Sequence, residues 1–203
     1  MNTYSQFSQD IYVFREIYKE KKNGFFVEVG AHDGIKFSNT LFLENNGWKG
    51  VCIEPHPAIF QLLLKNRPKC ICIDYAAYKE DDKLLPFIMS DISCGCSGFE
   101  YSNLHEFIKN KKRCVVKTKK LTTILDEIKA PSFIEYISLD TEGSELDILN
   151  GLDFNKYKIG YFSIEHNHHQ RNRESIRSFM ISKGYNFHRE NHVDDDYILK
   201  DIN

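Results

Sequence analysis

The fold is constrained most by a regular alternation of apolar runs of strand length with segments of helical patterning. Residues 25–29, 50–54 and 70–74 form three apolar runs, and residues 39–46 and 57–66 between them have the apolar spacing of helices. This βαβαβ order is typical of a parallel sheet whose crossover helices cover its faces. An α/β fold is therefore predicted from the first third of the chain.

The alternation returns toward the C-terminus after a less regular middle section. Residues 133–140 and 159–166 predict two more central strands, with a helix from about Glu142 to Asn150 between them. The remaining predicted elements are a helix at 173–183 and an antiparallel strand pair at 185–190 and 196–200. We therefore predict a mostly parallel seven-stranded sheet with an antiparallel terminal strand and helices on both faces.

The domain organisation is predicted to be simple. A length of 203 residues is usual for one domain, and no repeat or low-complexity linker divides the chain, so we assign residues 1–203 to a single domain. Residues 1–23 are expected to form a helical lead-in, because apolar side chains recur on one stripe between Gln9 and Lys21. Residues 80–130 break the alternation, and we interpret them as a variable elaboration on the substrate side.

Composition bounds the class of protein. The chain is 41% hydrophobic and 28% charged, and no apolar run approaches the roughly 18 residues of a membrane span. Its net charge of −2 disfavours nucleic-acid binding, and the basic stretch at 109–120 is interpreted as a solvated surface. The first residues lack a signal-peptide pattern, so a cytoplasmic location with reduced cysteines is expected. Cys94 and Cys96 lie in a loop-like segment that is expected to cover the substrate.

Acidic residues stand where the predicted strands end, which is the edge where parallel sheets bind ligands. They are Glu28, just before the turn Gly30-Ala31-His32-Asp33-Gly34, followed along the chain by Glu54, Asp74, Asp140 and Glu165. A row of like charges disfavours a bare phosphate and favours a ligand with cations and hydroxyls. Glu28 lies inside an apolar run, so it is expected to bond either the backbone of the turn or a cationic ligand.

The spacing of these acids predicts a nucleoside ligand. Glu54 follows the glycine turn by about 20 residues, the distance at which a carboxylate binds a ribose diol in nucleotide-binding sheets. The turn departs from G-x-G-x-x-G, which disfavours a dinucleotide. S-adenosylmethionine fits the pattern, with its adenine beside Asp74 and Tyr75 and its charged groups near the turn. Gly30 and Gly34 are expected to be small so that the backbone can approach this cofactor.

Four segments resemble the FkbM family of S-adenosylmethionine-dependent methyltransferases. They are "SQD" at 8–10, "FVEVGAHDG" at 26–34, "SNTLFLENNGWKGVCIEPHP" at 38–57 and "ISLDTEGSELDILNGL" at 137–152. The resemblance implies a Rossmann-like class I methyltransferase that methylates a hydroxyl of a sugar, glycan or small natural product. It also implies that the turn surrounds the methionine part of the cofactor and that N–H groups near Asn39 receive its carboxylate. The expected cofactor-binding residues are Glu28, Gly30, Ala31, Asp33, Gly34, Ser38, Asn39, Thr40, Glu54, Pro55, Asp74, Tyr75 and Asp140.

Transfer to a hydroxyl requires a base near the methyl group. We expect His166, Asp140 and Glu142 to be catalytic, with Glu165 and His168 as further candidates, because these residues follow neighbouring strands.

The same region is also similar to catechol O-methyltransferase, in which acids and an amide after the fourth and fifth strands hold magnesium. That similarity makes Asp140, Glu165 and Asn167 candidate Mg²⁺ ligands, and a metal would lower the pKa of a bound hydroxyl. The imidazoles of His166, His168 and His169 allow a softer metal, although adjacent histidines are more often solvated. A metal-dependent reaction and a metal-free reaction with a histidine base remain equally open.

Two other functions remain as alternatives. The acceptor could be a ribose 2′-hydroxyl of RNA, with the 109–120 stretch following the phosphates. The chain could also be a degenerate methyltransferase fold that binds a nucleoside or a partner without turnover. The partner we favour is a small-molecule or glycan hydroxyl, with no membrane involved.

Overall fold

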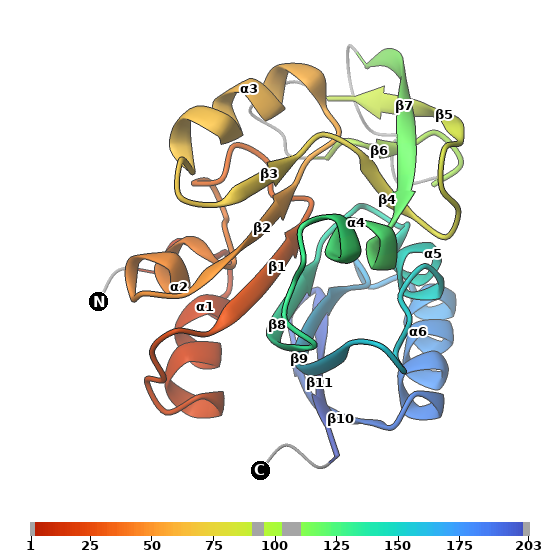
Figure 1. Cartoon of the computed structure of the whole chain (residues 1–203). Coiled ribbons are helices and arrows are strands. Elements are labelled where there is room, and N and C mark those ends of the chain that lie inside the picture. Colours follow the sequence, from red (N-terminus) through yellow and green to blue (C-terminus); the bar gives the residue numbers. More distant parts are fainter. Residues whose placement is uncertain (1–2, 91–95, 103–110, 201–203) are drawn as a thin grey trace.

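A central seven-stranded sheet forms the body of the computed structural model, which describes residues 3–90, 96–102 and 111–200 (Figure 1). In spatial order its strands are β10 (Tyr185–Asn191), β11 (Asp194–Leu199), β9 (Lys158–Glu165), β8 (Phe133–Leu139), β1 (Phe25–Val29), β2 (Lys49–Ile53) and β3 (Ile71–Ile73). Neighbouring strands from β9 to β3 pair in parallel, whereas β11 is antiparallel to both of its neighbours. The predicted mostly parallel sheet with an antiparallel last strand is confirmed.

The strand order reverses between β1 and β8. The chain runs outward from β1 through β2 to β3, and then returns to the other side of β1 to form β8 and β9. In open α/β sheets this reversal leaves a crevice at the carboxyl ends of the strands, and ligands bind there. The topology therefore places the ends of β1, β2 and β8 around one position.

Helices cover both faces of the sheet, as predicted (Figure 1). One face carries α1 (Gln9–Tyr12), the π-helix η1 (Val13–Ile17), α2 (Leu41–Asn45) and α3 (Pro57–Asn66), and the other carries α4 (Leu121–Glu127), α5 (Glu145–Asn150) and α6 (Gln170–Ser182). Alternate residues of β1 point to opposite faces. Phe26 packs with Phe14 on the first face, and Val27 packs with Leu121 on the second. Because both faces of the sheet are buried, side chains on both sides of each strand are apolar, and the strands are therefore continuous apolar runs in the sequence.

A second, four-stranded sheet lies near the carboxyl edge of the first (Figure 1). Its strands, in spatial order, are β4 (Ala76–Tyr78), β7 (Lys112–Lys120), β5 (Leu84–Met89) and β6 (Gly98–Phe99). Most of the basic stretch at 109–120 is the long strand β7, which was not predicted, although its charged side chains agree with the predicted solvated surface. Val116 and Thr118 of β7 are buried, and the charged residues between and beside them face outward.

Local signals explain several element boundaries. Helix α3 begins at Pro57, whose fixed backbone angle suits the first helical position, and the His56 ring accepts hydrogen bonds from two N–H groups of the first turn. The helix expected up to Lys21 ends earlier, at Ile17, after a π-helical turn. Within the described residues, no helix combines the length and apolarity that crossing a bilayer requires.

Candidate active site

A cavity lies at the carboxyl ends of β1, β2 and β8, where the strand order reverses. We call it the switch-point cavity. Its lining comprises Glu28, Val29, Gly30, Ala31, His32, Lys36, Phe37, Ser38, Ile53, Glu54, Pro55, Ile59, Ala76, Ala77, Phe87, Ser97, Gly98, Phe99, Asp140, Thr141 and Ser144. The central sheet supplies one wall and the second sheet supplies part of the other, through Phe87 and Phe99. The position agrees with the general location of ligands in such sheets.

Glu54 lies in this cavity in a fixed position. Its Oε2 accepts a hydrogen bond from the backbone N–H of His32 at 3.0 Å, and its Oε1 accepts one from the N–H of His56 at 2.8 Å. Burial raises the pKa of Glu54 to about 7, and these two hydrogen bonds oppose the effect. A carboxylate has about four acceptor positions, so Glu54 can still bind two hydroxyl groups. This arrangement suits a ribose diol.

The glycines of the turn are required by the packing of the protein itself, and Gly30 in addition lines the switch-point cavity. Gly30 has a φ of +84°, and a Cβ at this position would overlap the backbone carbonyl oxygen of Asp140. Gly34 has a φ of +77°, and a Cβ there would press on the side chain of Arg67. Gly34 and Asp33 do not line the cavity, and Asp33 instead accepts hydrogen bonds from backbone N–H groups of its own turn.

Glu28 is held by residues 38–40, which directly precede α2, and by a buried arginine. Its carboxylate accepts hydrogen bonds from the backbone N–H of Asn39 and the hydroxyl of Thr40, both at 2.6 Å, and from the hydroxyl of Ser38. The fully buried Arg67 lies 3.3 Å from the same carboxylate and also pairs with Glu44. The expected role of Ser38, Asn39 and Thr40 in receiving a cofactor carboxylate does not fit, because their N–H groups already donate to the Ile35 carbonyl, to Glu28 and to the Ser38 hydroxyl, respectively.

Two expected adenine contacts lie outside the switch-point cavity. Asp74 is exposed, and the ring of Tyr75 lies under the ammonium group of Lys119, which is 4.0 Å from the ring centroid. The next two residues, Ala76 and Ala77, line the cavity instead. The predicted adenine contacts therefore lie two residues before the residues that line the cavity, because the prediction used the first polar residue after β3.

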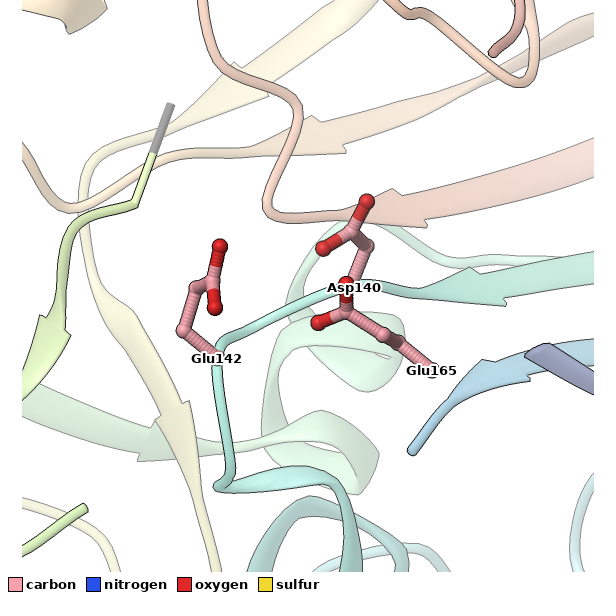
Figure 2. A group of neighbouring side chains, drawn as sticks. All are labelled: Asp140, Glu142 and Glu165. Atoms are coloured by element: carbon pink, nitrogen blue, oxygen red, sulfur yellow. The ribbon is translucent and has the colours of Figure 1, made fainter. Parts of the chain in front are cut away.

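Three carboxylates gather at the ends of β8 and β9. One oxygen from each of Asp140, Glu142 and Glu165 lies within 4.8 Å of the others (Figure 2). Burial, followed by repulsion from Glu142, raises the pKa of Asp140 to about 7. Burial, followed by the charge of Glu145, raises that of Glu142 to about 7. We call these three residues the carboxylate cluster, and they are the described group that could hold a metal.

The cluster differs from the expected metal-ligand set in one member. Glu142 takes the place of Asn167, whose side-chain amide donates a hydrogen bond to Glu142 at 3.0 Å. Glu142 has a φ of +57°, and this backbone conformation of the loop after β8 could not be read from the strand pattern. Burial and the charge of Asp140 raise the pKa of Glu165.

The structure places His166 away from the cluster. Its Nδ1 accepts a hydrogen bond from the backbone N–H of His168, and its Nε2 lies 3.6 Å from Asp195. His166 is the first residue after β9, and its side chain faces Asp195 of β11 and not the carboxylate cluster. The expectation that His166 removes a substrate proton does not fit this position, because the imidazole lines neither the switch-point cavity nor the groove described next.

A second cavity, with a volume of about 770 Å³, lies beside the cluster. We call it the polar groove, and its lining comprises Cys96, Tyr101, Ser102, Glu142, Gly143, Asn167, His169, Arg171, Asn172 and Ser175. Cys96 lies on its wall, as the expected cover of the substrate would, whereas Cys94 falls outside the described residues. Asp140 lines the switch-point cavity and Glu142 lines the groove, so the carboxylate cluster lies between the two.

Comparisons with known proteins agree with this geometry. The sequence matches the family model "Methyltransferase FkbM domain" over residues 28–187, whereas comparison with curated proteins gave no match. The METTL16 MTase domain is similar in structure, with a TM-score of 0.54, 10% identity and coverage of 93% of this chain and 64% of that chain. A precorrin-6y C5,15-methyltransferase from Geobacter metallireducens has a TM-score of 0.52, 11% identity and coverage of 95% and 88%. At these identities the structural likeness shows the fold alone, a class I Rossmann-like methyltransferase fold.

Proposed function

Because the chain belongs to the FkbM methyltransferase family, we propose that it transfers a methyl group to a hydroxyl of a sugar, glycan or small natural product. Family and fold together support a methyltransferase that depends on S-adenosylmethionine. The observation that supports a hydroxyl acceptor is the position of the carboxylate cluster, which lies between the switch-point cavity and the polar groove.

The residues of the switch-point cavity fit the cofactor in their chemistry. Glu54 offers acceptor positions for the ribose, and Ala76, Ala77 and Phe87 offer apolar surface for the adenine ring. The carboxylate of Asp140 suits an ammonium group in the same cavity. The cavity volume of about 80 Å³ is well below the roughly 300 to 1,000 Å³ of small-molecule sites. The cavity must therefore widen before a cofactor of this size can enter.

The chain itself must orient the acceptor and remove its proton. The bound cofactor supplies an electrophilic methyl group on sulfur. Glu142 lines the polar groove and is oriented by the amide of Asn167. Its pKa of about 7 is close to the value at which a general base works best at neutral pH. Glu142 therefore receives the hydroxyl proton in this proposal.

The polar groove supports a hydroxyl-rich acceptor. Hydroxyl, amide and imidazole groups of Ser102, Asn172 and His169 line it, and such groups bind sugars and polyols by hydrogen bonds. Arg171 adds a single positive charge among them. A groove of this composition suits a neutral, polar molecule better than a long polyanion.

RNA is a weaker candidate for the acceptor, because acids pair with four of the five basic side chains of the strand β7. Its side chains pair with acids as follows: Arg113 with Glu100, Lys117 with Asp82, Lys119 with Glu127, and Lys120 with Asp81. Paired cations attract phosphates less than unpaired ones, because the net charge of each pair is zero. The carboxylate cluster would also repel a phosphate near the reacting hydroxyl.

Cofactor binding and transfer are tested separately. In titration calorimetry, Glu54→Ala should weaken binding of S-adenosylmethionine about tenfold to hundredfold, because a hydrogen bond to a charged acceptor contributes roughly 1.5 to 3 kcal/mol. The matched control Asp74→Ala should bind as the wild type does, since Asp74 lies outside the cavity. Equal effects of the two substitutions would remove Glu54 from the cofactor site.

Transfer is tested with methyl-labelled cofactor and three acceptor panels: glycans, small alcohols and capped RNA. Label in a glycan or alcohol, with a large loss of kcat in Glu142→Gln and unchanged cofactor affinity, is the expected result. Label in RNA alone would replace the proposed acceptor with a ribose hydroxyl. Cofactor binding without transfer to any panel would favour the degenerate, nucleoside-binding alternative.

A further inference from the structure

The carboxylate cluster has no cationic partner within the part of the chain that the structure describes. Among those residues, Asp140, Glu142 and Glu165 form no salt bridge, while Arg173 and Arg177 beyond β9 are paired with Asp195. Several carboxylates withdrawn from water without a positive charge are costly, so the arrangement indicates that a cation belongs there.

An independent observation at Glu165 also points to a ligand. The Glu165 side chain is only 7% exposed, and its Oε2 has no hydrogen-bond partner among the described residues. Buried polar atoms almost always have a partner, so a lone carboxylate oxygen requires an explanation. This residue is part of the cluster, and one of its oxygens lies within 4.8 Å of oxygens of Asp140 and Glu142 (Figure 2).

We infer that Asp140, Glu142 and Glu165 together bind one hard divalent cation, of the Mg²⁺, Mn²⁺ or Ca²⁺ class. Three carboxylate oxygens are the ligand type that these ions prefer over soft metals. Three oxygens spread evenly around one ion are about 3.6 Å apart for Mg²⁺ and about 4.2 Å apart for Ca²⁺, which is √3 times the usual bond length. The three oxygens lie within 4.8 Å of one another, so they need to draw together by at most about 1 Å to bind one ion.

The location gives such an ion a role at the acceptor. The cluster extends from the switch-point cavity at Asp140 to the polar groove at Glu142. Water or a hydroxyl from the groove can complete the coordination shell, and a bound hydroxyl loses its proton more readily. With an ion bound, its charge lowers the pKa of Glu142, so the ion then activates the hydroxyl in place of Glu142 as the base, and the proton passes to water in the groove. This role rests on the proposed function, whereas binding of the ion does not, so the two can be tested apart.

Binding is measured with Mn²⁺ alone, without cofactor or acceptor, from the loss of the electron paramagnetic resonance signal of free Mn²⁺. The wild type should bind one Mn²⁺ per chain, and Mn²⁺ should raise its unfolding temperature. Glu165→Gln should weaken binding by about tenfold or more, because even residues that only support metal ligands often cost 10- to 100-fold. The exposed acid Glu174 is the matched control, and Glu174→Gln should bind as the wild type does.

The amide substitutions are chosen because the variants should remain folded, so that their Mn²⁺ affinity can be measured. Replacing a carboxylate by its amide removes a buried negative charge, so Glu165→Gln and Asp140→Asn should unfold at or above the wild-type temperature when Mn²⁺ is absent. Equal Mn²⁺ affinity in the wild type and in both of these variants would overturn the inference. So would a wild type that binds S-adenosylmethionine but no Mn²⁺. Mn²⁺ binding without methyl transfer would overturn only the proposed function.

Discussion

Glu54 should make the stability of the ligand-free protein depend on pH in a predictable way. Burial raises its pKa from 4.5 to about 7 in the folded chain. At about 1.36 kcal/mol per pKa unit, that difference corresponds to about 3 kcal/mol. The folded state binds the proton more tightly than the unfolded state, so Glu54 does not lower the free energy of unfolding below pH 4.5. The loss of stability grows between pH 4.5 and 7 and is complete above pH 7.

Glu54→Gln removes this titration and keeps the shape of the side chain. The amide can serve only one of the two N–H donors of His32 and His56, which costs about 1 to 3 kcal/mol at every pH. The free energy of unfolding of the variant minus that of the wild type should therefore rise by about 3 kcal/mol from pH 4.5 to pH 8. Urea denaturation at several pH values measures it, and taking the difference cancels the titration of other groups.

The control for this experiment is Glu16→Gln, which replaces an exposed glutamate on η1. The free energy of unfolding of this variant minus that of the wild type should stay nearly constant over the same pH range, because folding withdraws little of an exposed carboxyl group from water. A difference for Glu54→Gln that is equally flat would refute the reasoning. It would mean that water reaches Glu54 in the ligand-free protein and that its carboxylate is not held as the structure places it.

Three further substitutions test the packing and the assignment of roles. Gly30→Ala should lower the unfolding temperature far more than Gly47→Ala, because both glycines have positive φ but only at Gly30 would the Cβ overlap the carbonyl of Asp140; similar losses would contradict the overlap. Arg67→Met should destabilise the fold by about 3 to 5 kcal/mol in urea denaturation, since it leaves two buried carboxylates without their cation, and a loss below about 1 kcal/mol would count against that network. His166→Gln should reduce kcat by well under the roughly hundredfold that loss of a general base costs, and a larger loss with an intact fold would return His166 to the reaction.

The strands, their order along the chain and the acids at their ends could be predicted from the sequence because each depends on local patterning. The strand at 25–29 and the helix at 57–66 were predicted with the observed bounds. Burial on both faces makes a strand apolar along its whole length, and such a run can be recognised in the sequence without knowing which strands lie beside it. Glu54 could be found in the same way, because its spacing from the glycine turn is fixed by one βαβ unit.

The direction in which each acidic side chain points could not be predicted, since it depends on residues far away in the chain. The sequence showed that Glu28 needs a partner, but only the fold brings Arg67, 39 residues later, to its carboxylate. The basic stretch became the strand β7 because β4 and β5 supply its partners on either side, and no local pattern of the stretch indicates them. Pairing between distant segments is a tertiary property.

The sequence by itself determined that acids, an amide and imidazoles follow β8 and β9, since composition and spacing place them at one edge of a parallel sheet. Only the tertiary structure decided which of them meet. Glu142 joins Asp140 and Glu165 because the loop after β8 turns it inward at a φ of +57°. His166, the first residue after β9, lies outside the group because its side chain faces Asp195 of β11. The physical reason is that spacing fixes where a residue lies along the chain, whereas loop conformation and strand pairing fix where its side chain points.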